Sequence, residues 1–265
     1  MIFGFVHLAT KASFAQATDL KHQSIAPTIP GWKLIFDDEF NHPGLPNPAK
    51  WGYEVGFIRN HEAQYYAKAR LKNSFVHGGI LTIEGRHENY KGGAYSSASL
   101  TTQGKFSFTY GRVEMMAKLP QAVGTWPAFW MLGTDIQKVG WPKSGEVDIM
   151  EHVGFMPKTI FGTCHMADAN GKHYSKGGKI DLADHGAGWH RYMIDWSKSR
   201  IDFYVDNDLY FSYVKSASLP WSFSKPMYLI LNLAIGGSWG AQKGIDASAF
   251  PQKYNVKYVR VYQRG

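Results

Sequence analysis

The stretch 144-SGEVDIMEHVG-154 combines the apolar residues of a buried strand with three acidic side chains, Glu146, Asp148 and Glu151. Side chains of a β-strand alternate between its two faces, so Glu146 and Asp148 share one face. Glu151 lies five residues after Glu146 and should point to the opposite face. Strands seldom carry three carboxylates inward without a functional reason, and the third acid is out of step with the other two.

A β-bulge at Ile149 and Met150 would bring the three acids into line. A bulge inserts one residue into a strand, so that two residues oppose one residue on the neighbouring strand. Glu151 then joins Glu146 and Asp148 on one face, while the apolar residues between them face the core. Two glutamates placed in this way can bring their carboxyl groups to about 5–5.5 Å, the separation that retaining glycosidases use. Taken alone, the strand also permits a simpler interpretation, three solvated acids on an open sheet face.

The retaining mechanism gives each acid a role. One carboxylate attacks the anomeric carbon, and the other, protonated, donates its proton to the leaving oxygen and then activates water. Asp148 lies between the two glutamates, where its charge or hydrogen bond can modulate their protonation.

The composition indicates a globular protein rich in aromatic residues. The chain has 265 residues, of which 44% are hydrophobic, 19% charged and 15% aromatic. Many aromatic residues are typical of all-β folds and of sites that stack sugar rings. The net charge of +8 would suit nucleic acid, an anionic polysaccharide or a membrane surface. However, the basic residues are scattered and no nucleic-acid-binding motif occurs, so we expect neither a nucleic-acid nor a membrane partner.

The N-terminal sequence and the number of cysteines bear on where in or outside the cell the protein is located. Residues 2–10 are mostly apolar and Ala15-Gln16-Ala17 fits a cleavage site, which predicts a secretory signal peptide over residues 1–17 without its charged n-region. An ordinary disordered N-terminus is the alternative. Residues 18–30 read as a polar linker, and no apolar run is long enough for a transmembrane helix. The single cysteine, Cys164, excludes an intrachain disulfide and fits no zinc-ligand spacing. We expect a secreted or periplasmic protein.

From Trp32 onward the sequence consists of short strand-like runs separated by turn residues, with no segment of helical period and no repeat. We therefore predict one all-β domain over residues 31–265, an antiparallel β-sandwich of jelly-roll (concanavalin- or lectin-like) type. The last strand should pair near the first, WKLIFDDEF. The predicted strands lie within residues 32–40, 81–86, 106–119, 125–132, 146–153, 159–166, 190–197, 200–214 (a hairpin), 227–235 and 256–263.

The segment GEVDIMEHVG resembles the E-x-D-x-x-E signature of the bulged-strand members of glycoside hydrolase family 16. The resemblance continues, in the family's order, through FDDEFN, NHEAQYY, YGRVEMMAKLP, GTWPAFWMLG, GGSWG and YVRVYQ, and spans about residues 32–263. The histidine, valine and glycine after the third acid are most similar to the laminarinase (endo-β-1,3-glucanase) branch. This resemblance implies a β-jelly roll with a concave substrate cleft, in which Glu146 is the nucleophile, Glu151 the acid/base and Asp148 their assisting carboxylate.

Five aromatic or histidine side chains are expected in the cleft. Alternation along TWPAFWML puts Trp126 and Trp130 on one face, where they could stack against sugar rings; a pair of core tryptophans is the alternative. The resemblance places Trp141 at the nucleophile subsite and His165 in the cleft, and Trp239 should lie on a loop at the cleft rim.

Three further assignments follow. Asn60 matches the family's substrate-binding asparagine in the N-x-E-x-Q-Y stretch. With His165 in the cleft, alternation buries Cys164 on the other face. His152 follows Glu151 and should be a structural histidine on the core or convex side.

Two positions depart from the family pattern. Ser99 stands where the stretch Y-T-S-A-R often has an arginine that contacts sugar hydroxyls, which bears on the glucan preference. Lys257 stands where many relatives have an aspartate that binds a structural calcium ion. An ammonium group cannot ligate calcium, so we predict a weak or absent calcium site and no metal or other cofactor in catalysis.

These observations predict a monomeric, retaining endo-glycosidase that hydrolyses β-1,3-glucan (laminarin) or mixed-linkage β-1,3/1,4-glucan by double displacement. Two alternatives stay open. The net charge would suit a hydrolase of an anionic algal galactan of the agar, porphyran or carrageenan type. A non-catalytic β-glucan-binding protein could use the same scaffold, although such binders commonly lose the catalytic glutamates, and both are present here.

Overall fold

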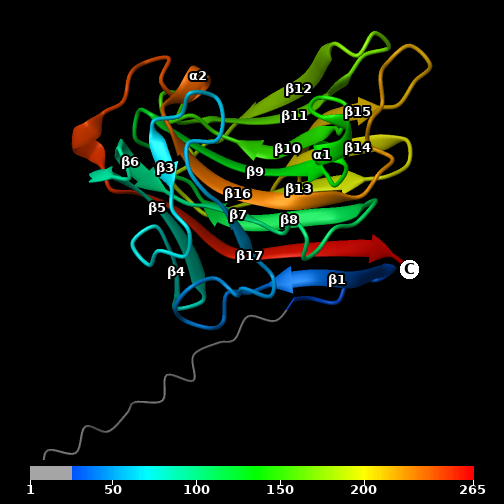
Figure 1. The fold of residues 1–265 in the computed structure, drawn as a ribbon. Helices are drawn as coiled ribbons and strands as arrows, with labels where there is room; N and C mark the ends of the chain where they lie inside the picture. Colours follow the sequence, from blue (N-terminus) through cyan, green and yellow to red (C-terminus); the bar gives the residue numbers. More distant parts are fainter. Residues whose placement is uncertain (1–25) are drawn as a thin grey trace, which may run out of the picture.

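The computed structural model describes residues 26–265, in which the chain forms two stacked β-sheets (Figure 1). The predicted signal peptide and most of the predicted linker lie outside the described residues. Among the described residues, no helix has the length and apolar character needed to cross a lipid bilayer. The helical elements within residues 26–265 are three short segments, α1 (Ile136–Val139), α2 (Gly237–Gly240) and a 3-10 helix (Ala247–Ala249).

One sheet has seven strands, in the spatial order β12-β11-β10-β9-β16-β7-β2, and every neighbouring pair is antiparallel. The acidic stretch forms β10, close to the middle of this sheet. The strands are β2 (Gly52–Glu54), β7 (Ser99–Thr101), β9 (Thr125–Gly133), β10 (Glu146–Glu151), β11 (Thr159–Ala167), β12 (His173–Asp181) and β16 (Met227–Ile235).

The other sheet has ten strands and contains both ends of the domain. The central path is β15-β14-β13-β8-β17-β5-β6-β3, with β1 paired to β17 and β4 paired to β5. The strands are β1 (Trp32–Asp38), β3 (Gln64–Tyr66), β4 (Ser74–His77), β5 (Ile80–Tyr90), β6 (Gly93–Ser97), β8 (Gly111–Lys118), β13 (His190–Trp196), β14 (Arg200–Val205), β15 (Asp208–Val214) and β17 (Gln252–Arg264).

The core between the sheets follows from alternation along the strands. In β9, Phe129 and Met131 point into the core and are fully buried, while Trp126 and Trp130 lie on the outer face. In β16 all nine residues are buried, with Leu229, Leu231 and Leu233 in the same core. Fully burying one such side chain contributes about 1.5–3 kcal/mol, so this shared core holds the two sheets together.

The pairing of the chain ends confirms one prediction. Strand β1 runs antiparallel to β17, from Trp32 opposite Arg264 to Asp38 opposite Val259, and the two lie side by side in Figure 1. The all-β, antiparallel prediction is confirmed with one exception, because β3 pairs with β6 in parallel.

The strand prediction placed one boundary wrongly and did not contain six strands, namely β2, β3, β4, β6, β7 and β12. Residues 106–110 lie outside β8, and only Phe108 makes an isolated bridge there, to Met227. Strand β12 was not predicted, because HYSKGGKID is polar and rich in glycine and shows no apolar alternation.

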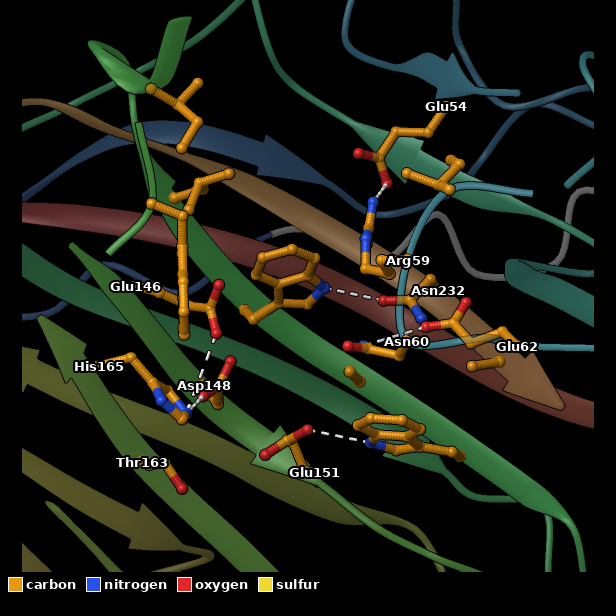
Figure 2. A pocket seen from close by; sticks show the side chains of 18 of the residues that line it. Glu54, Arg59, Asn60, Glu62, Glu146, Asp148, Glu151, Thr163, His165 and Asn232 are labelled. Carbon is orange, nitrogen blue, oxygen red and sulfur yellow. Dashed lines mark hydrogen bonds and ion pairs between the residues drawn. The ribbon is translucent and has the colours of Figure 1, made fainter. Parts of the chain in front are cut away.

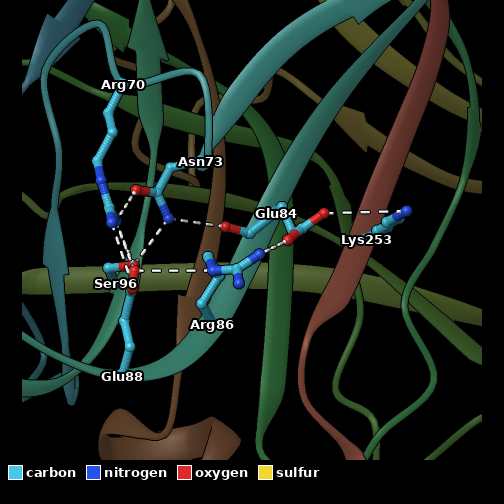
Figure 3. Close-up of polar contacts among 7 residues, drawn as sticks. All are labelled: Arg70, Asn73, Glu84, Arg86, Glu88, Ser96 and Lys253. Carbon is cyan, nitrogen blue, oxygen red and sulfur yellow. Dashed lines mark hydrogen bonds and ion pairs between the residues drawn. The ribbon is translucent and has the colours of Figure 1, made fainter.

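A network of charged and polar side chains fixes the loop between β3 and β4 to the ten-stranded sheet (Figure 3). The guanidinium of Arg70 donates to both carboxylate oxygens of Glu88 on β5 and to Ser96 on β6. Asn73 is fully buried and donates to Ser96 and to the backbone carbonyl of Glu84. The loop is therefore tied to two strands by its polar side chains.

Candidate active site

The bulge predicted in the acidic strand is present. Asp148 lies opposite Trp130 on β9, and the register then shifts so that Met150 lies opposite Phe129. On the other side the register with β11 shifts between Asp148 and Glu151. Val147, Ile149 and Met150 are all buried in the core between the sheets. The extra residue therefore returns Glu151 to the face of Glu146 and Asp148.

All three acids line one cleft on the outer face of the seven-stranded sheet (Figure 2). The cleft has a volume of about 710 Å³. Its lining comes from elements across the whole sheet, from Glu54 on β2 to His173 on β12. The other predicted site residues line the same cleft, namely Asn60, Trp126, Trp130, Trp141, His165 and Trp239.

Asp148 is the most enclosed of the three acids. Its side chain is 6% exposed, and Nε2 of His165 lies 3.0 Å from its Oδ2 atom and 3.9 Å from Oε1 of Glu146. Oδ2 accepts no well-directed hydrogen bond from any described residue, so the 3.0 Å contact acts as a charge interaction. Burial raises the pKa of Asp148 to about 8.

The two glutamates also hold protons more tightly than free carboxylates. Burial, and then the neighbouring Asp148, raises the pKa of Glu146 and of Glu151 to about 8. Positive charge on His165 and Arg59 opposes this effect at Glu146. Three carboxylates this close cannot all be ionised at neutral pH, and Glu146 is the member with two cations nearby. The row therefore retains a proton while Glu146 is the acid best placed to lose its own.

Trp126 contacts the third acid directly. Its indole Nε1 donates a hydrogen bond of 2.9 Å to Oε1 of Glu151, which lowers the pKa of that carboxyl and partly offsets burial. The ring of Trp239 packs edge-on against Trp126, with centroids 5.5 Å apart. Trp126 thus orients Glu151 in addition to lining the cleft.

Trp130 lines the cleft but is only 7% exposed. Its Nε1 donates to Oδ1 of Asn232 at 2.8 Å, and the guanidinium carbon of Arg59 lies 4.9 Å from its ring centroid. Nη2 of Arg59 donates to Glu54, which also accepts a 2.6 Å hydrogen bond from Ser99. At this place the guanidinium covers the indole ring.

Trp141 and two histidines form a group of packed rings beside Glu146 and Asp148. Trp141 is 48% exposed, and its ring centroid lies 4.5 Å from that of His173 on β12. Nδ1 of His165 lies 2.8 Å from Nε2 of His173, within hydrogen-bond distance. The rings of His165 and His173 are nearly parallel, with an angle of 14° between their planes.

Asn60 is held by a short chain of polar side chains. Its Nδ2 donates to Oε1 of Glu62 at 3.2 Å, and Nε2 of Gln64 donates to the other oxygen of Glu62 at 2.7 Å. Gln64 in turn accepts from the backbone N–H of Ile235 at 2.7 Å. The alternate residues of the N-x-E-x-Q stretch thereby connect the cleft surface to β16.

Cys164 and His152 lie on the buried faces to which alternation assigned them, and Lys257 lies on the other sheet. Cys164 and His152 are both fully buried, and burial raises the pKa of the Cys164 thiol well above its usual value. His152 Nδ1 lies 3.1 Å from the carbonyl oxygen of Thr159. Lys257 places its ammonium 4.4 Å from the ring centroid of Trp189, away from the cleft.

One cluster among residues 26–265 has a spacing that would suit a metal ion, and it belongs to this site. Single ligand atoms of Glu146, Asp148 and His165 lie within 4.8 Å of one another. The bulged carboxylate row brings these groups together without requiring an ion.

Several cleft residues were not predicted from the sequence. Asn232 carried a recognisable signal, because it is the single polar residue in the apolar run MYLILNLAI. Arg59 and Glu54 gave no such signal, since their meeting depends on how the loop between β2 and β3 folds over the sheet. His173 lies on β12, one of the strands that were not predicted.

Comparison with known proteins identifies the family. The sequence model of glycosyl hydrolases family 16 matches residues 61–260. A beta-glucanase of Rhodothermus marinus is 46% identical over 249 residues, which cover 88% of this chain and 86% of that protein.

Solved structures agree with this match. The laminarinase from Rhodothermus marinus superposes with a TM-score of 0.82 at 45% identity, covering 89% of this chain and 99% of that one. SCLam, a non-specific endo-beta-1,3(4)-glucanase from family GH16, also has a TM-score of 0.82, at 42% identity, and covers 91% of this chain and 94% of its own. The jelly-roll sandwich is thus confirmed, and the chain belongs to glycosyl hydrolases family 16.

Proposed function

We propose that this protein is a retaining endo-glycosidase that hydrolyses β-1,3-glucan or mixed-linkage β-1,3/1,4-glucan. The observation that carries the proposal is the bulged row of Glu146, Asp148 and Glu151 in the cleft. The similar proteins are a beta-glucanase, a laminarinase and an endo-beta-1,3(4)-glucanase, which supports β-glucan as the substrate class.

In the first step, the Glu146 carboxylate attacks the anomeric carbon and the glycosidic bond breaks. Glu151 gives its proton to the leaving oxygen, and a covalent glycosyl ester forms on Glu146. In the second step Glu151, now ionised, takes a proton from water, and the hydroxide attacks the same carbon and releases Glu146. Two inversions leave the anomeric configuration unchanged.

The surroundings of the two glutamates support these roles. Glu146 must be ionised to attack, and His165 and Arg59 favour its charged form. Glu151 must be protonated, and burial together with the neighbouring Asp148 favours that form. Two residues of the same type thus take different roles because their surroundings differ.

The extent of the cleft supports cleavage within a polymer. Its lining reaches from β2 at one edge of the seven-stranded sheet to β12 at the other. A polysaccharide chain can therefore cross the whole sheet with the carboxylate row beneath one of its inner linkages.

The charge of the cleft disfavours an anionic galactan. Among the described residues that line it, five are carboxylic acids and one is an arginine, although the whole chain carries a net charge of +8. The excess positive charge is therefore outside the cleft, where it cannot neutralise a bound polyanion. Retention of Glu146 and Glu151 on one face of the cleft equally disfavours a purely glucan-binding protein.

We also propose that catalysis needs no metal or cofactor, because two carboxylates supply the nucleophile and the proton that this reaction requires. The leader-like sequence of residues 1–17 supports a secreted or periplasmic enzyme, which we propose acts as a monomer.

The experiment that tests this function has two parts. A product profile on laminarin, lichenan, agarose and carrageenan should show internal cleavage of laminarin, lichenan or both, with retained anomeric configuration by NMR. Cleavage of carrageenan alone, or inverted products, would overturn the proposal.

Substitution of the acids tests the roles. Glu146→Ala and Glu151→Ala should each lower turnover by a factor of about 10² or more while the circular dichroism spectrum stays unchanged. Azide should rescue Glu151→Ala on an activated aryl glycoside, since azide attacks the glycosyl ester without a base. Near wild-type hydrolysis of laminarin by either variant would exclude that residue from catalysis.

A further inference from the structure

The contact between His165 and His173 sets a condition on their protons. Nδ1 of His165 and Nε2 of His173 are 2.8 Å apart, so one nitrogen must carry a hydrogen and the other must not. The other ring nitrogen of His165, Nε2, lies 3.0 Å from Asp148 and 3.9 Å from Glu146. His165 thus connects the carboxylate row to a second histidine.

Two proton arrangements of the histidine pair suit the state in which the carboxylate that faces His165 is ionised. In neutral His165 the hydrogen must be on Nε2, because a bare nitrogen lone pair facing a carboxylate is repelled. Nδ1 then accepts a hydrogen bond from Nε2–H of His173. In protonated His165 both nitrogens carry hydrogens, and Nδ1–H donates to a bare Nε2 of neutral His173. Both arrangements keep Nε2–H of His165 toward the acids.

His173 is placed to serve in both arrangements. Burial, and then the charge of His165, lowers the pKa of His173, and both effects favour the neutral form of His173. Its ring is held in position by Trp141, whose centroid lies 4.5 Å away. The titratable groups around His165 are thus the three acids of β10 and His173 on β12, with the buried Cys164 thiol on the opposite face of β11.

We propose that His173 is a positioning residue that fixes the tautomer and orientation of His165, so that Nε2–H of His165 faces Asp148 and Glu146. His173 itself does not touch the reacting atoms in this role. It acts by keeping positive character beside the nucleophile Glu146 at the pH of catalysis. This inference rests on the proposed function of the carboxylate row, and its structural part can be tested without activity.

The test compares His173→Phe with His173→Gln. Phenylalanine keeps a flat ring against Trp141 but cannot hydrogen-bond, whereas the glutamine amide can donate to or accept from Nδ1 of His165. Two-bond ¹H–¹⁵N spectra of the histidine rings report the tautomer directly, with the His165 signals assigned from their loss in His165→Gln. His77→Phe, at an exposed histidine on β4 of the other sheet, is the matched control.

We expect His165 to be the Nε2–H tautomer in the neutral wild-type protein and a mixture of tautomers in His173→Phe. The acid limb of kcat/KM on laminarin should move to higher pH in His173→Phe by about one unit, the effect of losing one hydrogen bond of ordinary net strength. The sign follows because positive charge on His165 favours the ionised form of Glu146, so a weaker contact between them raises the pH at which Glu146 ionises. His173→Gln should restore the tautomer and most of the shift, and His77→Phe should match the wild type.

Unchanged ¹⁵N shifts and an unchanged pH profile in His173→Phe would overturn the inference. Equal shifts in His173→Phe and His173→Gln would also overturn it, because the hydrogen bond would then not be the cause. A wild-type protein that cleaves no glucan would instead refute the proposed function, and the tautomer measurement would still decide the role of His173.

Discussion

The hydrogen bond from Trp126 to Glu151 is a residue-scale feature with a measurable effect. The indole N–H stabilises the ionised carboxylate and so lowers the pKa of Glu151. In Trp126→Phe this donor is lost while an aromatic ring remains. The pKa of Glu151 should rise by about one unit, and the alkaline limb of kcat/KM should move to higher pH by the same amount, because the acid stays protonated for longer.

A matched control is available in the same cluster. Trp239 packs edge-on against Trp126, and Trp239→Phe should leave the alkaline limb in place because that indole makes no hydrogen bond to Glu151. Equal displacement of the limb in both variants would show that aromatic packing, and not the N–H donor, sets the pKa of Glu151.

At the residue scale, the sequence predicted those site residues whose positions follow from alternation along a single strand. Glu151 lies five residues after Glu146, which would put them on opposite faces of a regular strand. The bulge inferred from this mismatch places both on the face of Asp148. The pairing of Arg59 with Glu54 could not be predicted, since it depends on the path of a loop and not on the period of a strand. The cover that Arg59 provides over Trp130 was missed for the same reason.

At the scale of elements, the loop between β3 and β4 depends on the ion pair between Arg70 and Glu88 (Figure 3). Arg70 is the main cause that lowers the pKa of Glu88 to about 2. The unfolded chain has a glutamate pKa of about 4.3, so this carboxylate stabilises the fold above that pH and loses its effect as the pH falls toward 2. Glu88→Gln should therefore unfold at a lower urea concentration than the wild type at neutral pH.

The pH dependence distinguishes this effect from lost packing. The difference in urea midpoint between Glu88→Gln and the wild type should narrow as the pH is lowered from about 5 toward 2. Asp208→Asn, at an exposed position that begins β15, should have no comparable effect. If the difference in urea midpoint stays constant over this pH range, the charge of Glu88 does not contribute to stability.

Strand prediction succeeded where one face of a strand is apolar or the whole strand is buried. Strands β9 and β16 were recognised because their inward residues fill the core. Strand β12 lies at the edge of its sheet, with only intermediate and exposed residues, so burial left no pattern in its sequence. Its absence from the prediction also concealed His173, and with it half of the histidine pair.

At the scale of the whole molecule, Lys257 bears on how the fold responds to calcium. Its ammonium lies 4.4 Å from the ring centroid of Trp189 on the sheet that does not carry the cleft. The Lys257 ammonium carries a positive charge and has no lone pair, so it cannot bind a calcium ion in this region. The midpoint of thermal unfolding and the rate on laminarin should therefore be the same in excess calcium and in EDTA.

The control for this prediction is a ligand that must stabilise the fold if the function is right. A laminarin oligosaccharide added to Glu146→Ala should raise the unfolding temperature by mass action. A calcium-dependent rise of similar size would show that the ion binds despite Lys257.

The closure of the domain was predicted correctly, because both terminal strands have clear alternation and β1 pairs with β17 along its length. The parallel pairing of β3 with β6 was not predicted, since strands of three and five residues carry too short a pattern to fix a direction.

The spacing of the strands in the seven-stranded sheet sets the length of the cleft floor. One row passes from Glu151 through Ala128, Asn232 and Ser99 to Glu54, one residue on each strand. Neighbouring strands are about 4.8 Å apart, so the six intervals of the sheet limit the cleft floor to roughly 29 Å. Gain or loss of an edge strand would change the length of polymer that fits by one interval and leave the carboxylates where they are.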